Sequence, residues 1–190
     1  MTGDKKDQSK RTNLIKTVTS PLSFFILTML IIETIFLSLL AAGEYFIAYL
    51  LSASNCIVTV TLGRAEGFDL LIVNPKNKTL KISVKTTFYK TKSLMMTKKV
   101  EEIKDPDLFY AFVRYSEIQK LPDYWIVPSK IVAERVAFSH QKWLETPKRD
   151  GSQHKDSAMR KFYLVNHKSY PPNWETILKQ YKNNIDPILE

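Results

Sequence analysis

The sequence predicts an α/β domain, in which helices flank a mixed sheet of about five strands, preceded by a hydrophobic helix. Short apolar runs bounded by turn residues recur between positions 57 and 127. Residues 22–42 form a longer apolar run that contains one ionisable residue, Glu33. The 190-residue chain is therefore expected to consist of a basic tail with a hydrophobic helix, 1–42, and one domain, 43–190.

The predicted strands follow from apolar runs and alternation, and lie at 57–62, 68–73, 80–87, 108–115 and 124–127. Residues 74–78 (NPKNK) are typical of a turn, so the second and third strands should form a β-hairpin. Ser129 is expected to N-cap the helix that follows the last strand. Residues 145–172 are predicted to be a long loop, a kind of segment that is often functional, before a C-terminal helix at 174–181.

Three polar residues fall at particular places on these elements. Asp69 lies at the start of the second strand, Lys85 near the end of the third, and Glu44 on the helix before them. Side chains two residues apart on a strand share a face, so Ser83 and Lys85 should point the same way. The hairpin should bring Asp69 beside them.

The stretches GEYFIAYLL, AEGFDLLIVN and KTLKISVKTT carry these residues, and DLFYAFVRY and PDYWIVPSKIVA follow them. From Gly43 to about Leu178 the chain resembles an uncharacterised bacterial group in the PD-(D/E)xK, restriction-endonuclease-like nuclease superfamily. Its first half looks like the archaeal-type Holliday-junction resolvases, in which a helix glutamate precedes the hairpin aspartate and an xVK strand. The resemblance extends through the C-terminal pattern that includes His140, Trp143, Pro147, Gly151, His154, Asp156, Arg160, Tyr170 and Trp174.

This resemblance implies a restriction-endonuclease-like core and a Mg²⁺- or Mn²⁺-dependent endonuclease. In such an enzyme Asp69, Glu44 and Lys85 are the catalytic residues. Asp69 and Glu44 are the metal ligands, and Ser83 stands where active nucleases carry the third acid. A serine offers a hydroxyl in place of a carboxylate, which is the ligand that hard cations prefer. Catalytic activity therefore stays open at this stage.

The chain carries a formal net charge of +9, and residues 76–99 contain eight lysines and no acid. A positive surface there would attract nucleic acid, with DNA as the first candidate. The expected contacts are Lys76, Lys78, Lys90 and Lys92. The alternative is that these lysines only keep an edge strand soluble.

The segment GSQHKDSAMRKF adds Arg160 and His154 as candidate phosphate contacts. Asp156 is expected to staple the loop, while His140 and His167 have no evident partner in the sequence and are interpreted as surface or packing residues. Cys56 is the single cysteine, so no intramolecular disulfide can form, and it is expected in the core.

Residues 22–42 are long enough to span a bilayer, which needs roughly 20 apolar residues. We expect membrane attachment through this segment, although the basic residues before it would place the domain outside the cytoplasm and leave the orientation open. The alternatives are a helix buried by the domain or by a second copy in a homodimer, and a mis-assigned start codon near Gly43.

The sequence thus favours a membrane-attached or cytoplasmic metal-dependent nuclease-like protein that hydrolyses the phosphodiester bonds of nucleic acid. The competing hypothesis is a catalytically inactive nuclease-fold module that binds nucleic acid or protein and is tethered at a membrane. Pathway, substrate structure and oligomeric state are not predicted.

Overall fold

The computed structural model describes residues 21–61, 67–88, 91–117 and 120–190. The chain divides into two compact units, Met1–Ala41 and Ala42–Glu190. Every described residue of the first unit is helical and belongs to α2 (Pro21–Ala53), whose last residues are part of the second unit.

The N-terminal part of α2 is apolar and exposes its large side chains, among them Phe24 and Phe25. No residue of its most apolar stretch is buried, and by length and composition the helix could cross a membrane. The hydroxyls of Thr28, Thr34 and Ser38 each donate to the carbonyl four residues earlier, at 2.8–2.9 Å. These three polar side chains are thus satisfied within the helix itself.

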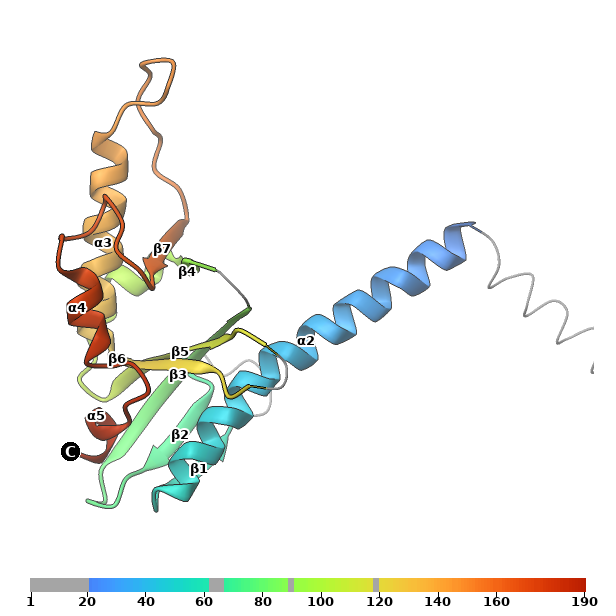
Figure 1. The fold of residues 1–190 in the computed structure, drawn as a ribbon, viewed down its shortest axis with the longest axis vertical. Helices are drawn as coiled ribbons and strands as arrows, with labels where there is room; N and C mark the ends of the chain where they lie inside the picture. The colour runs from blue at the N-terminus through green and yellow to red at the C-terminus, as the bar shows by residue number, and fades with distance from the viewer. Residues whose placement is uncertain (1–20, 62–66, 89–90, 118–119) are drawn as a thin grey trace, which may run out of the picture. The chain divides into compact units, whose positions relative to one another are not determined.

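The second unit contains a five-stranded sheet in the order β1-β2-β3-β5-β6 (Figure 1). Its strands are β1 (Ile57–Val60), β2 (Leu70–Val73), β3 (Thr79–Phe88), β5 (Leu108–Tyr115) and β6 (Asp123–Pro128). The β3–β5 pair is parallel and the other three pairs are antiparallel. The predicted mixed α/β fold with five strands is therefore confirmed, and position 62 of the first predicted strand lies outside the described residues.

The predicted hairpin turn between β2 and β3 depends on Asn74, which is buried. Its side-chain oxygen accepts the backbone N–H groups of Lys76 and Lys78, and its amide donates to the carbonyl of Ile188 at 2.9 Å. Asn77 adopts a positive φ of 61°, a conformation that asparagine tolerates better than most residues. The turn is thus fixed by its own sequence and by the C-terminal segment.

Alternation along the strands gives the sheet two buried faces. On one face, Ile47 and Leu51 of α2 pack with even-numbered residues of β2 and β3, such as Ile82, and with the odd-numbered residues of β5. Cys56 is buried in this core, as expected. On the other face, Tyr110 and Phe112 of β5 pack under α3, α4 and a second sheet.

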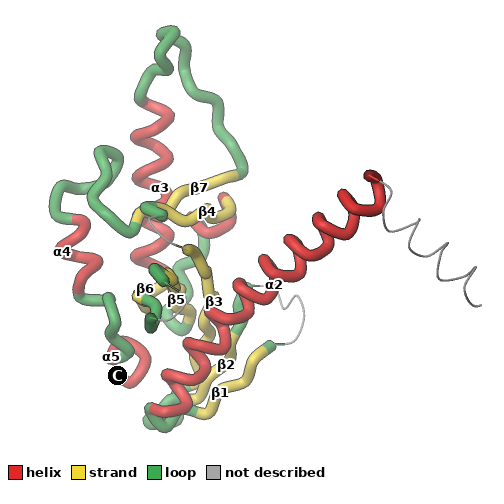
Figure 2. The backbone as a smooth tube through the Cα atoms, turned by 45° about the vertical axis from the view of Figure 1, so that its right-hand side comes forward, coloured by secondary structure: helices red, strands yellow, loops and turns green. Residues whose placement is uncertain are grey.

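The second sheet has two antiparallel strands, β4 (Ser93–Thr97) and β7 (Met159–Tyr163), which lie together beside α3 (Figure 2). Neither strand was predicted, because β4 falls within the lysine-rich stretch and β7 within the expected loop. A short 3-10 helix, η1 (Lys98–Glu101), follows β4. One face of the pair is buried through Leu94, Met96 and Phe162, and the other is open.

The remaining helices are α3 (Ser129–Glu145), α4 (Trp174–Lys179) and α5 (Asp186–Leu189). The predicted cap at Ser129 is wrong. Ser129 is the first helical residue, and its hydroxyl donates to the carbonyl of Asp105 at 2.6 Å because the helix begins directly at the end of β6. The predicted C-terminal helix is present as α4 and is two residues shorter than expected.

Candidate functional site

The β2–β3 hairpin sets Asp69 beside Ser83 and Val84. Asp69 precedes β2, and its backbone N–H donates to the carbonyl of Ile82 at 2.8 Å, which continues the hairpin register. One carboxylate oxygen, Oδ2, accepts the Val84 N–H at 2.6 Å and the Ser83 hydroxyl at 3.3 Å. The other oxygen, Oδ1, has no hydrogen bond with a described residue, so it is available to a ligand.

Lys85 completes a chain of polar contacts on this face of the sheet. Its ammonium donates to the Ser83 hydroxyl at 3.0 Å, so Ser83 connects the lysine to Asp69. Ser83 and Lys85 line a hollow of about 520 Å³, here called the site groove, whose other walls include Gly67, Lys99 and Tyr110. The three polar side chains thus meet where the sheet opens onto a groove.

Glu44 approaches this cluster from α2 without a direct contact. Among the described residues it forms no hydrogen bond with Asp69, Ser83 or Lys85. Burial raises the pKa of Glu44, the negative charge of Asp69 raises it further, and Lys85 opposes the shift. The two carboxylates are therefore near enough to repel, as ligands of one cation would be in its absence.

Gly43 allows this approach of the helix to the sheet. A Cβ atom at this position would overlap the hydroxyl oxygen of Thr86 and lie 3.2 Å from that residue's own Cβ. The missing side chain lets the first turns of the helix in this unit rest directly on β3, which brings the next residue, Glu44, to the end of the hairpin.

The predicted nucleic-acid-binding lysines are not gathered at this site. Lys76 and Lys78 lie in the turn that precedes β3, where Lys76 donates to the carbonyl of Glu190 and Lys78 pairs with Asp107 at 2.9 Å. Seven residues of extended chain, roughly 23 Å, separate Lys78 from Lys85. Lys92 is exposed just before β4, and Lys90 lies outside the described residues.

The guanidinium of Arg160, an expected substrate contact, is engaged within the protein in this structure. It is 3% exposed and forms ion pairs with Glu101 and Asp156. Its remaining donors contact the carbonyls of Ser157 and Met159, so all five N–H groups are used within the protein. Arg160 instead holds β7 to η1.

Asp156 staples the loop before β7, as the sequence indicated. It accepts hydrogen bonds from Lys98 at 2.8 Å and from His140 at 2.7 Å, and these contacts lower its pKa. His154 stacks on Trp143 with ring centroids 4.0 Å apart. His154 therefore packs against an aromatic side chain of α3.

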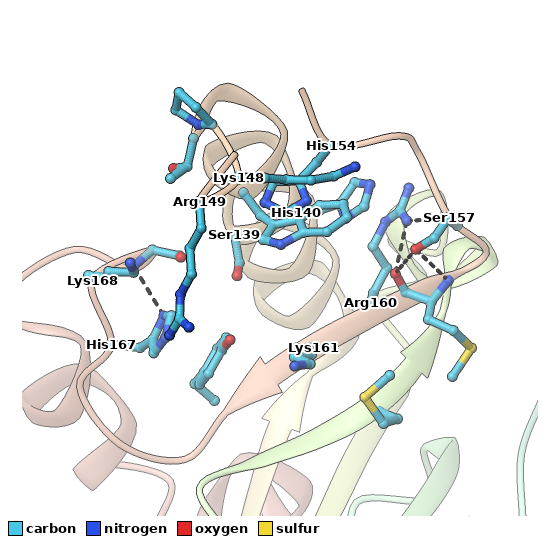
Figure 3. A pocket seen from close by; sticks show the side chains of 17 residues that line it. Ser139, His140, Lys148, Arg149, His154, Ser157, Arg160, Lys161, His167 and Lys168 are labelled. Atoms are coloured by element: carbon cyan, nitrogen blue, oxygen red, sulfur yellow. Dashed lines mark hydrogen bonds between the residues drawn. The ribbon is translucent and has the colours of Figure 1, made fainter. Parts of the chain in front are cut away.

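Sequence reasoning missed a second hollow of about 520 Å³, here called the histidine pocket, which Figure 3 shows. It lies among α3, the following loop, β7 and the segment after it, and all three histidines of the chain line it: His140, His154 and His167. His167 stacks on Tyr163 at 3.9 Å. The sequence signals for this pocket were the length of the loop over 145–172 and the candidate phosphate contacts His154 and Arg160, both of which line it.

The described residues contain no group of three or more histidine, cysteine or acidic side chains placed to hold a metal ion. The candidate site thus offers two carboxylates, those of Asp69 and Glu44, and the Ser83 hydroxyl at most, and of these three residues only Ser83 lines the site groove. This donor set is at the lower end of what Mg²⁺ uses in proteins, where one or two carboxylates are joined by water and substrate phosphate.

The protein thus contains an α/β domain in which Asp69, Ser83 and Lys85 form a polar cluster on the β2–β3 hairpin. No model of a protein family matches this chain, and no characterised protein matches it. Among solved structures the chain is similar to a bacterial homing endonuclease, with 14% sequence identity and a TM-score of 0.44. That similarity covers 79% of this chain and 89% of the endonuclease.

Proposed function

We propose that residues 43–190 form a metal-dependent nuclease domain of the PD-(D/E)xK kind, which hydrolyses phosphodiester bonds of nucleic acid, with DNA as the first substrate to test. The observation that carries this proposal is the contact chain from Asp69 through Ser83 to Lys85 at the site groove. Glu44 supplies a second carboxylate whose pKa responds to Asp69.

Asp69 Oδ1 and the Glu44 carboxylate would hold Mg²⁺ or Mn²⁺, with the Ser83 hydroxyl beside them. A bound cation would polarise the scissile phosphate and lower the pKa of a coordinated water. Asp69 is well prepared for this task, because the Val84 N–H and the Ser83 hydroxyl fix one of its oxygens and leave the other free.

Lys85 is proposed to position the attacking water and to balance negative charge on the phosphate. Its ammonium is held by Ser83 at the wall of the groove, where it can orient an attacking water and stabilise negative charge that develops on the phosphate. Positive charge at Lys85 and Lys99 also favours entry of a polyanion into the groove.

A catalytically inactive binding module is the second candidate, and one observation favours it. A serine occupies the position from which a third carboxylate would reach the cation, and its hydroxyl is already engaged by Asp69 and Lys85. On this alternative the groove binds nucleic acid, or a protein, without cutting it.

We also propose that residues 22–42 attach the protein to a membrane. The support is the apolar stretch of α2, none of which is buried, and the hydrogen bonds that the hydroxyls of Thr28, Thr34 and Ser38 form within the helix. A bilayer satisfies exposed apolar side chains but offers no partners to polar ones. The side of the membrane on which the domain lies is left to experiment.

The two candidate functions are separated by metal titration and cleavage with the full-length protein in detergent. We expect Mn²⁺ binding by calorimetry, and nicking of plasmid DNA with Mg²⁺ or Mn²⁺. Asp69→Asn should abolish both, and Lys85→Met should abolish cleavage alone. The control Asp150→Asn removes an exposed acid outside both hollows and should change neither.

Cleavage that persists in Asp69→Asn would show that the active site lies elsewhere. Nucleic-acid binding without cleavage in any metal would favour the inactive module. A parallel assay with RNA of the same sequence determines which nucleic acid is preferred.

A further inference from the structure

The histidine pocket is lined by positive side chains and by none of the chain's described carboxylates. Lys148, Arg149, Lys161 and Lys168 reach it from three segments, together with the three histidines and the buried Arg160 (Figure 3). None of these four forms a salt bridge with a described residue. Within the described part of the chain no carboxylate pairs with these four side chains, in contrast to Arg160, which pairs with Glu101 and Asp156.

The acids nearest to this wall are already engaged. Asp150 accepts hydrogen bonds from Ser152, and Asp156 accepts them from Lys98 and His140. Burial lowers the pKa of His167, and the charges of Lys168 and Lys161 lower it further. The interior of the pocket thus has a positive field, which stabilises an anion as it destabilises a protonated imidazole.

The pocket and the site groove share a floor. Met95 of β4 and Met159 of β7 line both hollows. The pairing of Met95 with Lys161 and of Thr97 with Met159 puts these four side chains on the open face of the two-stranded sheet. The open face of the β4–β7 sheet therefore adjoins both the groove, which Lys85 lines, and the pocket, which Lys161 lines.

We infer that the histidine pocket binds the phosphodiester backbone of the same nucleic-acid strand whose reacting phosphate lies at Lys85. The inference rests on the proposed function for its ligand class and adds a second contact region, which sets how the strand is held. Lys148, Arg149 and Lys168 neutralise its phosphates, and the β4–β7 face supports the strand between the two sites.

Size and chemistry agree with this assignment. A hollow of about 520 Å³ accommodates a nucleotide-sized group. The five residues of β4, or of β7, span roughly 15 Å. This length corresponds to about four nucleotides at duplex spacing. Lysine and arginine bind phosphate oxygens through charge and hydrogen bonds without reading base sequence.

The experiment measures binding of a fluorescent single-stranded oligonucleotide to the full-length protein in detergent, with EDTA present so that catalysis plays no part. The pocket variant is Lys148→Gln, Arg149→Gln, Lys168→Gln. The matched control, Lys104→Gln, Lys130→Gln, Lys179→Gln, removes the same charge from exposed positions that line neither hollow.

We expect the pocket variant to weaken binding by about tenfold or more, and to reduce the slope of log affinity against log salt by about 2, because three single-strand phosphate contacts are lost. The control variant should change the affinity by less than about threefold. Oligonucleotides with and without a 5′-phosphate distinguish a terminal phosphate from an internal one, since only a terminal site prefers the phosphorylated form.

Trp143 supplies an independent readout. It lines the pocket and is 38% exposed, whereas Trp125 and Trp174, the other tryptophans of the chain, are 3% and 0% exposed. The oligonucleotide should therefore protect the fluorescence of Trp143 from quenching by neutral acrylamide.

Equal losses in the two triple variants, or a Trp143 that stays as accessible with the oligonucleotide as without it, would overturn the inference while leaving the proposed function intact. A wild-type protein that binds no nucleic acid at all would instead remove the proposed function.

Discussion

Ser83 is the residue on which the chemistry of the site depends most. Ser83 is buried, and its hydroxyl donates to Asp69 and accepts from Lys85, so it links the two charged side chains without adding charge. A carboxylate in this place would add a metal ligand, and it would also add a second negative charge close to Asp69. The serine thus favours a stable hairpin over strong cation binding.

The first prediction is that Ser83→Glu makes the protein more dependent on metal. Without metal the variant should melt at a lower temperature than wild type, because it buries a carboxylate beside Asp69. Mn²⁺ should bring the melting temperature of the variant back up. The affinity of the variant for Mn²⁺, measured by calorimetry, should exceed that of wild type by about tenfold, or 1.4 kcal/mol.

Ser83→Gln is the matched control for size, and should show no gain in Mn²⁺ affinity. A titration of Ser83→Glu that matches wild type would mean that no cation binds beside this residue.

The second prediction concerns the pH dependence of stability at Glu44. Because burial and Asp69 raise its pKa in the folded protein, ionisation of Glu44 lowers the free energy of unfolding as pH rises through that pKa. Glu44→Gln should therefore be more stable than wild type at neutral pH. The difference should vanish below about pH 4, where the carboxyl is protonated in both states.

Urea unfolding at several pH values measures this difference. With saturating Mn²⁺ at neutral pH, wild type should instead be more stable than Glu44→Gln. Wild type is stabilised by the bound cation, whereas the variant lacks one of the two carboxylates that would hold it. A variant that is less stable than wild type at neutral pH without metal would contradict the assignment of Glu44 to a functional site.

At the scale of elements, the contact between α2 and β3 positions the site. The third prediction is that Gly43→Ala destabilises the protein by about 1–3 kcal/mol, because the added methyl overlaps Thr86 and pushes the helix from the strand. In a Thr86→Ala background the same change should cost less or even stabilise, as alanine favours helix over glycine by about 1 kcal/mol.

Chemical denaturation of the four proteins in this cycle gives the coupling between the two positions. Strict additivity would show that helix and strand do not meet at Gly43.

The sequence was sufficient to predict β1, β2, β3, β5 and β6, because each is an apolar run with turn residues beside it. β4 and β7 were missed for a physical reason. SLMMT and MRKFY are each half exposed and only five residues long, and each gains its stability from a partner more than sixty residues away.

The functional residues, too, could be predicted from the sequence only in part. Asp69, Ser83 and Lys85 are joined by a local hairpin, so register alone predicts that they meet. The histidine pocket needs α3, β7 and two loops to pack together, and no local pattern reports that. The ion pair of Arg160 with Glu101 was not predicted, because Glu101 lies on η1, a segment for which the sequence predicted no structure.

At the scale of the whole molecule, the two units differ in whether their apolar side chains are buried. The Ala42–Glu190 unit buries its own two cores, whereas the apolar stretch of α2 before it is buried by nothing in the described structure. Contiguous exposed apolar surface of this extent marks an interaction site.

The fourth prediction is that full-length protein fractionates with membranes and needs detergent for release, while a chain lacking residues 1–42 stays folded and soluble. Circular dichroism and gel filtration test the truncated form, and carbonate extraction tests the full-length one. Ile31→Lys places a charge in the middle of the segment and should weaken insertion by about 2.5–3.5 kcal/mol.

A truncated protein that aggregates, together with full-length protein that is soluble without detergent, would identify the segment as a core or dimerisation helix.

The pairing of β4 with β7 also sets when the binding face comes into being during synthesis. Leu94 and Met96 are buried only once β7 has left the ribosome, about sixty residues after β4. At about 5–20 residues per second this delay lasts roughly 3–12 s, during which β4 is an apolar segment that chaperones can bind. Because Met95 of β4 and Met159 of β7 line both the groove and the pocket, neither hollow is complete on the nascent chain before β7 has been made.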